Sequence, residues 1–429
     1  MNTRRVKPSA PSSERAALLT LLTRATRGVD PDASLDELAG LASAAGAQVV
    51  VRAVQERPNP DPATLFGKGK AVEFAATCAA AGVDIVIVDH VLSPAQARNL
   101  EAVFDCRVID RTELILDIFA KRARTREGKL QVELAQLQYM LPRLVGSAAA
   151  LSRLGGGIGT RGPGETKLET DRRRIRHRVA ALKREIADVS ERRGYLRERR
   201  RRTEVPTVAL VGYTNAGKTT LFNALTGDTA VVSDALFVTL DPLVRRVKLP
   251  DTRQIIVSDT VGFIDRLPHQ LVAAFRATLE EVIHADLLLH VIDAAAPDRE
   301  RRERAVRDVL TEIGAGHVPM LEVLNKCDQL AIVDRDRLAA TAPGAVCVSA
   351  AHGDGVRELV DLMASRVAMD AERTTFTLDF SNDSDRQVLT ELHRHARVTS
   401  QVTVGSQITV EADVPRRIRE RFLRMQAIP

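Results

Sequence analysis

Residues 33–122 show two alternating patterns of apolar and polar positions. Short apolar runs bounded by turn-forming residues alternate with segments in which apolar residues recur every three or four positions. We expect helices that begin at the capping sequence Ser34–Glu37, cover Lys68–Ala81, run from Ser93 to Phe104 and begin again at Thr112, and strands at Gln48–Val54, Val83–Asp89 and Cys106–Ile109. Strands and helices that alternate at this spacing predict a small parallel α/β domain.

A heptad-like pattern follows. Steps of four and three residues connect Leu130, Leu134, Leu137, Leu141 and Leu144, and similar steps connect Leu168, Ile175, Val179, Leu182, Ile186 and Val189. The glycines between residues 155 and 164 cannot continue a helix. The pattern predicts two helices joined by a glycine-rich loop into an antiparallel hairpin, with outer faces left for solvent or for a partner.

The alternation of strands and helices returns after the hairpin. Apolar runs predict strands at Thr207–Val211, Gln254–Ser258, Leu287–Ile292, Met320–Leu324 and Ala345–Val348. The end of the chain, Thr374–Met425, reads as a strand, a helix at Asp383–His395, two strands around Gly405 and a basic helix. We therefore expect a multidomain α/β protein: a small α/β N-terminal domain (1–125), a long helical hairpin (126–203), a doubly wound α/β domain (204–370) and a small α+β C-terminal domain (371–429).

Composition narrows the class of protein. A chain of 429 residues is too long for one ordinary core. The four cysteines are scattered without a Cys-x-x-Cys pair, which argues against a disulfide framework or a zinc site and favours the reducing cytoplasm. No apolar run is long enough to span a bilayer. The start, Met1–Glu14, is basic and lacks the apolar region of a secretory signal, so we expect a flexible terminus.

Positive charge is concentrated in one segment. The chain carries a formal net charge of +6, but residues 165–202 hold 15 Lys and Arg against seven Asp and Glu, a local charge of +8. The remainder of the chain is therefore slightly acidic, at −2. Arginine-rich helices are often only solvated faces, but this concentration is also typical of proteins that bind RNA phosphates.

The segment Gly212–Thr219 has the pattern of a phosphate-binding P-loop. It follows an apolar strand and precedes a helix-forming run, so its backbone N–H groups can converge on phosphate oxygens at a helix N-terminus. Lys218 is expected to neutralise the β- and γ-phosphates and Thr219 to ligate Mg²⁺. The residues expected to bind phosphate are Gly212, Tyr213, Thr214, Asn215, Ala216, Gly217, Lys218 and Thr219. Gly67–Lys70 lacks the full pattern and is expected to open a helix.

Two later segments indicate a guanine base. Asn325, Lys326, Cys327 and Asp328 follow an apolar strand, at the sheet edge where ligands bind in open α/β folds. Asp328 can accept both guanine N1–H and N2–H₂, a donor pair that adenine lacks. Lys326 would lie along the base, and Asn325 would tie the base to the loop. Ser349, Ala350 and Ala351 follow the next strand and resemble the segment whose backbone meets guanine O6 in GTPases.

The segments between these sites have the features of GTPase switches. Asp259, Thr260, Val261 and Gly262 end a strand; Asp259 would hold Mg²⁺ through water, and the Gly262 N–H could meet the γ-phosphate. Thr239 lies in Phe237, Val238, Thr239, Leu240 and Asp241, where a switch threonine would complete the Mg²⁺ shell only while the γ-phosphate is present. Lys218, Thr239 and Gly262 are thus the expected catalytic residues of a P-loop GTPase domain.

Phe263 stands where many GTPases carry the glutamine that orients the attacking water. Phenylalanine cannot hydrogen-bond water, so intrinsic hydrolysis is expected to be slow or to depend on a partner. Asn215 resembles the asparagine of potassium-activated GTPases, which gives K⁺ as a second candidate cofactor beside Mg²⁺.

Together these features resemble the HflX family of GTPases. The most specific resemblance lies in Gly155–Gly159, Arg161–Ile175, Phe237–Asp241 and Asp259–Phe263, with Leu65–Gly69 matching the N-terminal domain of the family. The resemblance implies a cytoplasmic GTPase that binds GTP and GDP and associates with the large (50S) ribosomal subunit and its rRNA, with a role in ribosome splitting, rescue or biogenesis. We expect it to be monomeric. The residues expected to contact RNA are Arg153, Arg161, Lys167, Arg172, Arg173 and Arg174.

Two other functions stay open at this point. One is a metabolic or signalling GTPase, against which stands the lack of a second cluster of candidate catalytic residues outside the nucleotide domain. The other is a regulator on anionic lipid, against which stands the lack of a Trp- and Phe-rich face on the basic hairpin.

Overall fold

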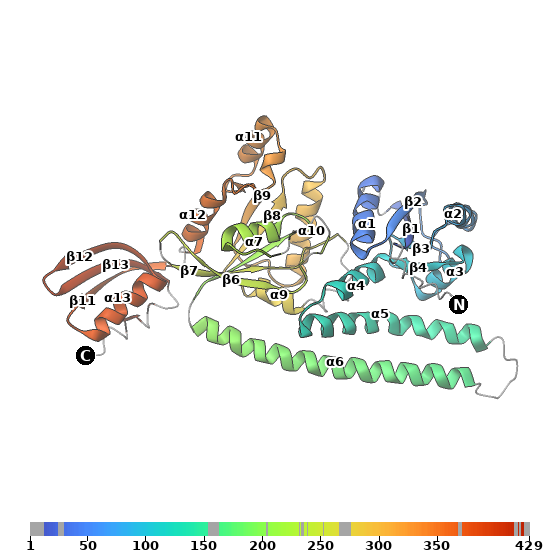
Figure 1. Ribbon diagram of the computed structural model, residues 1–429, viewed down its shortest axis with the longest axis horizontal. Helices are drawn as coiled ribbons and strands as arrows, with labels where there is room; N and C mark the ends of the chain where they lie inside the picture. Colours follow the sequence, from blue (N-terminus) through green and yellow to red (C-terminus); the bar gives the residue numbers. More distant parts are fainter. Residues whose placement is uncertain are drawn as a thin grey trace, which may run out of the picture. The chain divides into compact units, whose positions relative to one another are not determined.

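The structure is a computed structural model, and it describes residues 13–24, 30–152, 163–202, 205–230, 232, 236–237, 239–251, 253–265, 276–367, 371–415, 419 and 422–423. Most of the expected glycine-rich loop, most of the expected flexible terminus and most of the expected C-terminal basic helix lie outside these residues. Gly164, which was expected to lie in the loop, belongs instead to the first turn of a helix that begins at Pro163. The chain divides into two compact units. The first extends to Ile186 and also includes Leu236 and Phe237; the second contains most of the remainder. The bounds of the four predicted domains stay predictions. Figure 1 shows the helices and strands of both units.

The first unit contains a four-stranded parallel sheet in the order β2-β1-β3-β4. The strands are β1 (Arg15–Leu22), β2 (Gln48–Glu56), β3 (Ile85–Val88) and β4 (Arg107–Asp110), and the helices are α1 (Pro31–Ala45), α2 (Lys68–Ala80), α3 (Pro94–Phe104) and α4 (Arg111–Arg122). The predicted parallel α/β domain is thus confirmed. Strand β1 was not predicted, although it is central and six of its eight residues are buried. Its Ala- and Leu-rich sequence contains Thr20 as its one β-branched residue, whereas several such residues usually mark a strand.

Two helix starts differ from the prediction. Helix α1 begins at Pro31 with Asp30 as its cap, because the Asp30 carboxylate accepts from the Asp32 N–H. Ser34 lies inside the helix instead, where its hydroxyl donates to Asp89 at 2.6 Å. Helix α4 is capped by Asp110, not by Thr112, because Asp110 Oδ1 accepts from the Glu113 N–H at 2.9 Å.

The predicted hairpin consists of α5 (Arg126–Ser152) and α6 (Pro163–Arg202). Arg178 donates to both carboxylate oxygens of Glu133 at 2.7 and 2.8 Å, and Arg126 lies 3.6 Å from Glu185, so the helices are antiparallel (Figure 1). The outer face of α5 was expected to be left for solvent or for a partner, but it is covered by the same chain. It packs against α3 and α4, where the Arg143 guanidinium donates to Asp110 and to the Leu92 carbonyl, each at 2.9 Å.

The second unit contains a six-stranded sheet in the order β10-β9-β8-β5-β7-β6. The strands are β5 (Thr207–Gly212), β6 (Leu243–Lys248), β7 (Gln254–Asp259), β8 (Leu287–Asp293), β9 (Met320–Asn325) and β10 (Val346–Cys347); the helices are α7 (Lys218–Thr226), α9 (Arg276–Ile283), α10 (Arg299–Glu312), α11 (Ile332–Thr341) and α12 (Val356–Val367), with a 3₁₀ turn at Cys327–Gln329. All pairs are parallel except β6 with β7. The antiparallel edge strand β6 was not predicted, because its exposed arginines hide the alternation.

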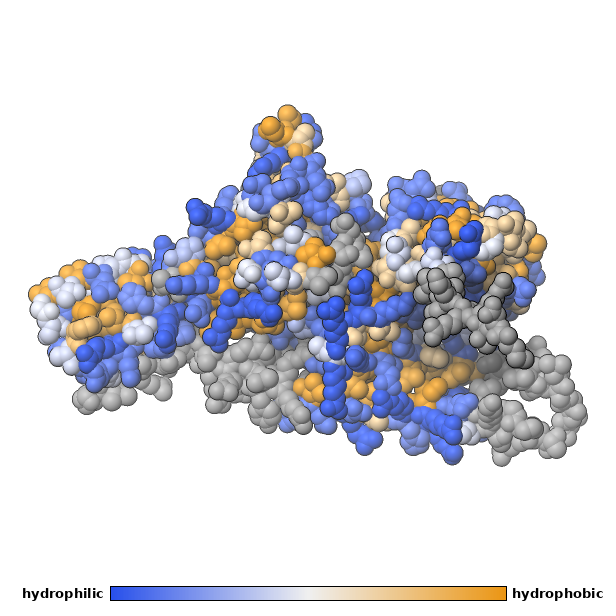
Figure 2. Space-filling view, viewed as in Figure 1, coloured by the Kyte–Doolittle hydropathy of each residue, from blue (hydrophilic) through white to orange (hydrophobic). Residues whose placement is uncertain are grey.

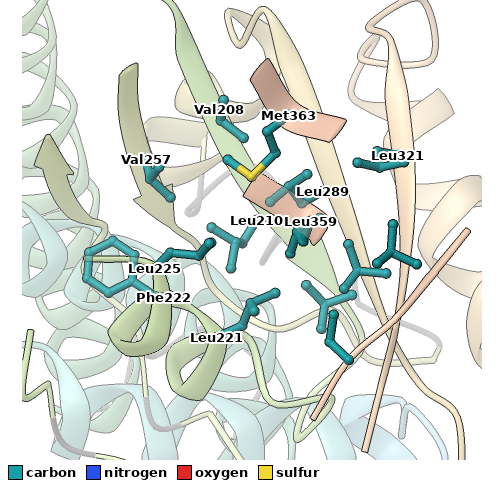
Figure 3. Packing of buried hydrophobic residues seen from close by; sticks show 14 of the residues in the cluster. Val208, Leu210, Leu221, Phe222, Leu225, Val257, Leu289, Leu321, Leu359 and Met363 are labelled. Carbon is teal, nitrogen blue, oxygen red and sulfur yellow. The ribbon is translucent and has the colours of Figure 1, made fainter. Parts of the chain in front are cut away.

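The core of this sheet fixes the helix that follows β5. Leu221, Phe222 and Leu225 of α7 pack with Leu359 and Met363 of α12 over the strands, as Figure 3 shows. Because α7 is anchored by these side chains, the loop between β5 and α7 starts and ends on rigid elements.

The C-terminal part is a three-stranded antiparallel sheet in the order β11-β13-β12, formed by β11 (Ala371–Asp379), β12 (Arg397–Val404) and β13 (Gln407–Pro415). Helix α13 (Asp383–His395) covers one face, where Val388 and Leu392 pack against Phe376 and Val410. This α+β arrangement was predicted, and α13 has the predicted bounds.

Hydrophilic residues cover most of the face shown in Figure 2. The orange tip at the top of that view lies over α11, whose first residues, Ile332 and Val333, are exposed. None of the described helices combines the length and the apolar character that crossing a lipid bilayer requires.

Candidate active site

The predicted nucleotide motifs meet at one edge of the six-stranded sheet. The phosphate loop, Gly212–Thr219, follows β5; Asp259 ends β7; and Asn325 ends β9. These strands are parallel, so their carboxyl ends lie on the same side of the sheet. The edge collects residues that are far apart in sequence, as expected for ligand sites in open α/β sheets.

The backbone of the phosphate loop requires glycine at both ends. Gly212 has φ of 154°, and a β-carbon there would lie 2.2 Å from the Val291 carbonyl oxygen. Gly217 has φ of 88°, and a β-carbon there would lie 2.2 Å from the Asn325 side-chain nitrogen. Helix α7 begins at Lys218, directly after this turn. The positive end of its dipole and its first N–H groups suit an anion such as phosphate.

Lys218 is the buried cation of this loop. Its side chain donates to the carbonyl oxygens of Gly212 and Tyr213 at 3.1 and 2.7 Å. Burial lowers the pKa of Lys218 to about 8, and the nearby Asp259 carboxylate opposes part of that shift. An ammonium held this way is poorly solvated, so a phosphate anion beside it would be strongly favoured.

Three oxygen-bearing side chains meet beside the loop. The Thr219 hydroxyl lies 2.8 Å from both the Thr239 hydroxyl and Asp259 Oδ2, and the Thr239 hydroxyl donates to Asp259 Oδ2 at 3.1 Å. Asp259 is fully buried, its second oxygen has no partner, and burial raises its pKa despite the opposing Lys218 charge. An unpaired buried carboxylate oxygen beside two hydroxyls fits Mg²⁺, which prefers oxygen ligands.

The second switch segment, Asp259–Asp265, turns back over the phosphate loop. Thr260 is fully buried and donates through its hydroxyl to the Leu210 carbonyl at 2.6 Å. Gly262 lies so close to the loop that a β-carbon would approach the Thr214 Cα to 2.9 Å and the Lys218 Nζ to 3.0 Å. The Phe263 side chain is 1% exposed. It is therefore part of the core and does not replace the missing glutamine.

The base loop, Asn325–Asp328, is tied to the phosphate loop through Asn325. Its amide nitrogen donates to the Ala216 carbonyl at 2.9 Å, and its amide oxygen accepts from the Ala350 N–H at 3.0 Å. Lys326 has φ of 64° and forms an ion pair with Asp293 at 2.7 Å.

Asp328 is the exposed end of the base loop. The Ser349 hydroxyl, the nearby His352 and Lys326 lower its pKa, with the Ser349 hydrogen bond as the largest cause. An ionised carboxylate that is held as an acceptor matches the two donors of guanine.

The remaining predicted residues are placed as follows. Phe237 is buried in the first unit, where its ring packs edge-on against Phe119 with centroids 4.7 Å apart. Leu240 is buried, Asp241 is half-buried and Ala351 is exposed. Val238, Arg153 and Arg161 lie outside the described residues, as does the side chain of Lys167. On α6, Arg173 and Arg174 are exposed and Arg172 is half-buried.

Several residues with roles at this edge were not singled out from the sequence. Asp293 ends β8 and pairs with Lys326, and His352 contacts the Ser349 hydroxyl at 3.0 Å. Asp293 could have been found, because it directly follows the apolar run of β8 at the carboxyl edge. His352 lies in a turn and has no such signal. His290, inside β8, is 1% exposed, and burial lowers its pKa to about 3, so it is neutral.

Comparison with known proteins identifies three successive families along the chain. Residues 32–120 match "GTP-binding GTPase N-terminal", residues 122–200 match "GTP-binding GTPase Middle Region", and residues 207–326 match "50S ribosome-binding GTPase". Among solved structures, a GTP-binding protein from Sulfolobus solfataricus in complex with GDP is 24% identical; the alignment covers 82% of this chain and 98% of that one. Its TM-score of 0.42 is too low to relate individual residues.

Relatives of known name extend over almost the whole chain. GTPase HflX of Caldanaerobacter subterraneus subsp. tengcongensis is 44% identical over 96% of this chain and 94% of its own length. GTPase HflX of Escherichia coli K12 is 49% identical over 80% of this chain and 81% of its own length. A shared nucleotide fold alone would not extend this identity to the first 200 residues, and the chain therefore belongs to the HflX family of GTPases.

Proposed function

We propose that this GTPase binds the large ribosomal subunit and its rRNA while it holds GTP, and that hydrolysis favours release. The observation that carries the proposal is the exposed arginine pair Arg173 and Arg174 on α6, in a segment with a local charge of +8. Such a helix can contact many phosphates of RNA, and arginine also stacks on bases. The match to a family described as 50S ribosome-binding GTPase supports the same partner. We infer that the protein acts in the cytoplasm as a monomer, in ribosome splitting, rescue or biogenesis.

The site residues suggest how the nucleotide state is sensed. Thr219 and Thr239 would hold Mg²⁺ directly and Asp259 would hold it through water, because their oxygens already meet. The metal would supply positive charge to the β- and γ-phosphates. Thr239 lies in the segment Phe237–Asp241, where a switch threonine is expected. Its hydroxyl would complete the Mg²⁺ shell only while the γ-phosphate is present. Lys218 would neutralise the same phosphates, and Gly262 would donate its N–H to the γ-phosphate.

Intrinsic hydrolysis is proposed to be slow and to be stimulated by the ribosome. The buried Phe263 cannot orient water, so another group must do so. Asn215, which has φ of 58° in the phosphate loop, is a candidate to help hold K⁺ near the phosphates. Replacing sodium by potassium is then expected to raise GTP turnover, and an unchanged rate would remove this part of the proposal.

The main test measures GTP turnover and co-sedimentation with purified large subunits. We expect subunits to stimulate turnover, and a non-hydrolysable GTP analogue to increase the fraction of protein that pellets with them. Lys218→Ala is the control that should abolish both nucleotide effects. No stimulation, together with pelleting that does not depend on the nucleotide, would contradict the proposal.

The same purified protein can be used to distinguish two alternative functions. A regulator at a membrane surface would bind anionic vesicles and not large subunits. A metabolic or signalling GTPase would bind neither, and its turnover would not respond to subunits. The exposed arginines of α6 favour ribosome binding over a metabolic or signalling function, because a metabolic or signalling function gives these arginines no role.

A further inference from the structure

Backbone hydrogen bonds hold the second switch segment on the phosphate loop. The Phe263 N–H donates to the Gly212 carbonyl at 3.0 Å, and the Phe263 carbonyl accepts from the Thr214 N–H at 2.7 Å. Tyr213 and Phe263 therefore form an isolated parallel β-bridge, which lies outside the named strands. The segment is closed over the loop, and any group that holds its far end also holds this closed arrangement.

Two side chains hold the far end at Asp265. The Tyr213 hydroxyl accepts from the Asp265 N–H at 2.9 Å. From the other side, the Arg301 guanidinium of α10 donates to Asp265 Oδ2 at 2.9 Å and to Asp298 Oδ2 at 2.6 Å. The side chains of Arg301 and Asp265 are 28% and 30% exposed, so the ion pair is partly shielded from solvent. We name Tyr213, Asp265 and Arg301 the switch latch.

The latch is fixed to the rest of the second unit at both of its ends. Tyr213 belongs to the phosphate loop, and its ring lies 5.3 Å from the guanidinium of Arg302 on α10. Arg301 is held in turn by Asp298, just before α10 begins. Asp265 is therefore positioned by a loop and a helix that are themselves rigidly anchored.

Gly262 lies between the two ends of the closed segment. Its backbone is so close to Thr214 and Lys218 that only glycine fits, and Lys218 is the cation assigned to the β- and γ-phosphates. A small shift of Asp265 would move the Gly262 amide relative to that cation. The Phe263 side chain is buried and cannot face the γ-phosphate, and the Gly262 amide is the group expected to do so.

We propose that Tyr213 and Arg301 are positioning residues for GTP hydrolysis, which act by holding Asp265 and thereby the Gly262 amide beside the γ-phosphate. The latch favours the closed arrangement, in which the Thr239 hydroxyl also lies at Asp259. Loss of the latch should weaken recognition of the γ-phosphate and leave recognition of GDP intact. This inference rests on the GTPase assignment and on the expected role of Gly262, and it does not depend on ribosome binding.

The sharpest variant is Tyr213→Phe, which removes one hydroxyl and keeps the ring. In the full-length protein without ribosomes, we expect GTP turnover to fall about three- to tenfold, the range that loss of one hydrogen bond supports. Affinity for a non-hydrolysable GTP analogue should fall by a similar factor, and affinity for GDP should change by less than about twofold. The matched control is Tyr139→Phe, which removes a hydroxyl that lies 3.4 Å from Glu113 in the first unit. It should leave all three values unchanged.

The second variant is Arg301→Gln, with Arg301→Lys as the conservative replacement. Arg301→Gln should show the same split between the GTP analogue and GDP, and Arg301→Lys should recover part of the loss because it keeps the charge. The double variant with Tyr213→Phe should lose less than the product of the single losses, because both side chains act on Asp265.

Either of two results would overturn the proposal. One is wild-type turnover and analogue affinity in both Tyr213→Phe and Arg301→Gln. The other is an equal loss of affinity for GDP and for the analogue together with a lower unfolding temperature, which would show a merely structural role. Both can be measured without ribosomes, so a failure of ribosome binding would not affect the outcome.

Discussion

The side chain expected to select the base is the Asp328 carboxylate. It accepts from Ser349, and that hydrogen bond is the main reason for its lowered pKa. It is therefore an acceptor at neutral pH. This predicts a preference for bases with two adjacent donors, which guanine has.

Asp328→Asn should shift this preference towards xanthine nucleotides. Xanthine carries a carbonyl where guanine carries its amino group, and an asparagine amide can donate to a carbonyl. We expect GDP affinity to fall about 10- to 100-fold, as for loss of a charge-assisted hydrogen bond, and affinity for xanthosine diphosphate to rise. Competition binding measures both. Asp334→Asn, an equivalent change on exposed α11, should alter neither. Loss of both nucleotides in Asp328→Asn would contradict the assigned role of Asp328.

Lys218 gives nucleotide binding a defined pH dependence. In the free protein its pKa is lowered to about 8, mainly by burial, and phosphate beside it would raise the pKa again. At pH 8.5 the free protein has lost much of this proton, so GDP binding should take up a proton and affinity should fall as the pH rises above about 8. Calorimetry in two buffers of different ionisation enthalpy measures the uptake. At pH 7, where Lys218 is already protonated, its contribution should vanish. A buffer-independent enthalpy at pH 8.5 would disprove the coupling.

Lys218 also determines how the folding stability of the nucleotide-free protein changes with pH. The folded pKa of Lys218 is below the unfolded value of 10.5, so the unfolded chain binds more protons between pH 8 and 10.5. The contribution of Lys218 to stability therefore rises across that window. Below pH 8 both states carry the charge, and the folded state bears the unfavourable burial of an ammonium.

At the scale of helices and strands, the sequence predicts elements whose pattern is local. Helix α13 has the predicted bounds, because polar caps surround a clear amphipathic pattern. Strands β1 and β6 were not predicted, for opposite reasons. Strand β1 is buried on both faces and reads as a uniform Ala- and Leu-rich run, whereas β6 is an edge strand with exposed arginines. Their positions are set by the sheets around them, which no local pattern contains.

The candidate site shows the same division. The phosphate and base loops were predictable because each is a contiguous run of characteristic residues. Asn325 was expected to tie the base to the loop, but its partner, the Ala216 carbonyl, was not predicted, because the two residues are far apart in the chain. The latch residue Asp265 was also missed, since its role depends on Arg301 of a helix that approaches it only in the folded protein. Long-range contacts carry these roles.

Helix α6 should be held in the hairpin mainly by its apolar seam. Leu182 is fully buried, whereas the Arg178–Glu133 ion pair is about 45% and 41% exposed. Leu182→Ala is expected to lower the free energy of unfolding by about 2–5 kcal/mol, and Arg178→Ala by about 0.2–1 kcal/mol. Denaturant unfolding of both variants followed by circular dichroism tests this. Equal losses would show that charge, not the seam, holds the two helices together.

At the scale of the whole molecule, charge is distributed unevenly. The segment 165–202 carries +8 while the remainder carries −2, so ribosome binding should depend strongly on salt. Because the basic charge lies on one helix, a few substitutions there should change the salt dependence without disturbing the nucleotide site.

Arg173→Glu combined with Arg174→Glu should weaken binding to large subunits and reduce the slope of log affinity against log salt by about two. Co-sedimentation over a salt series measures this. Arg335→Glu with Arg337→Glu is the matched control. Both pairs are exposed, and each contains one arginine 3.9 Å from an aspartate three residues earlier. GTP turnover without subunits should be unchanged in both. Equal weakening by the two pairs would show that charge alone, and not α6, matters.

The hydrogen bond from Asn325 to Ala216 also has a consequence for the thermodynamics of nucleotide binding. The base loop and the phosphate loop are tied before any ligand arrives, so GTP does not have to bring two independent halves together. The conformational entropy of the two loops is already lost during folding, not on binding. The two halves of the nucleotide would therefore meet a preformed pair of loops. Breaking this link is expected to lower affinity through entropy, even though Asn325 uses both ends of its amide within the protein.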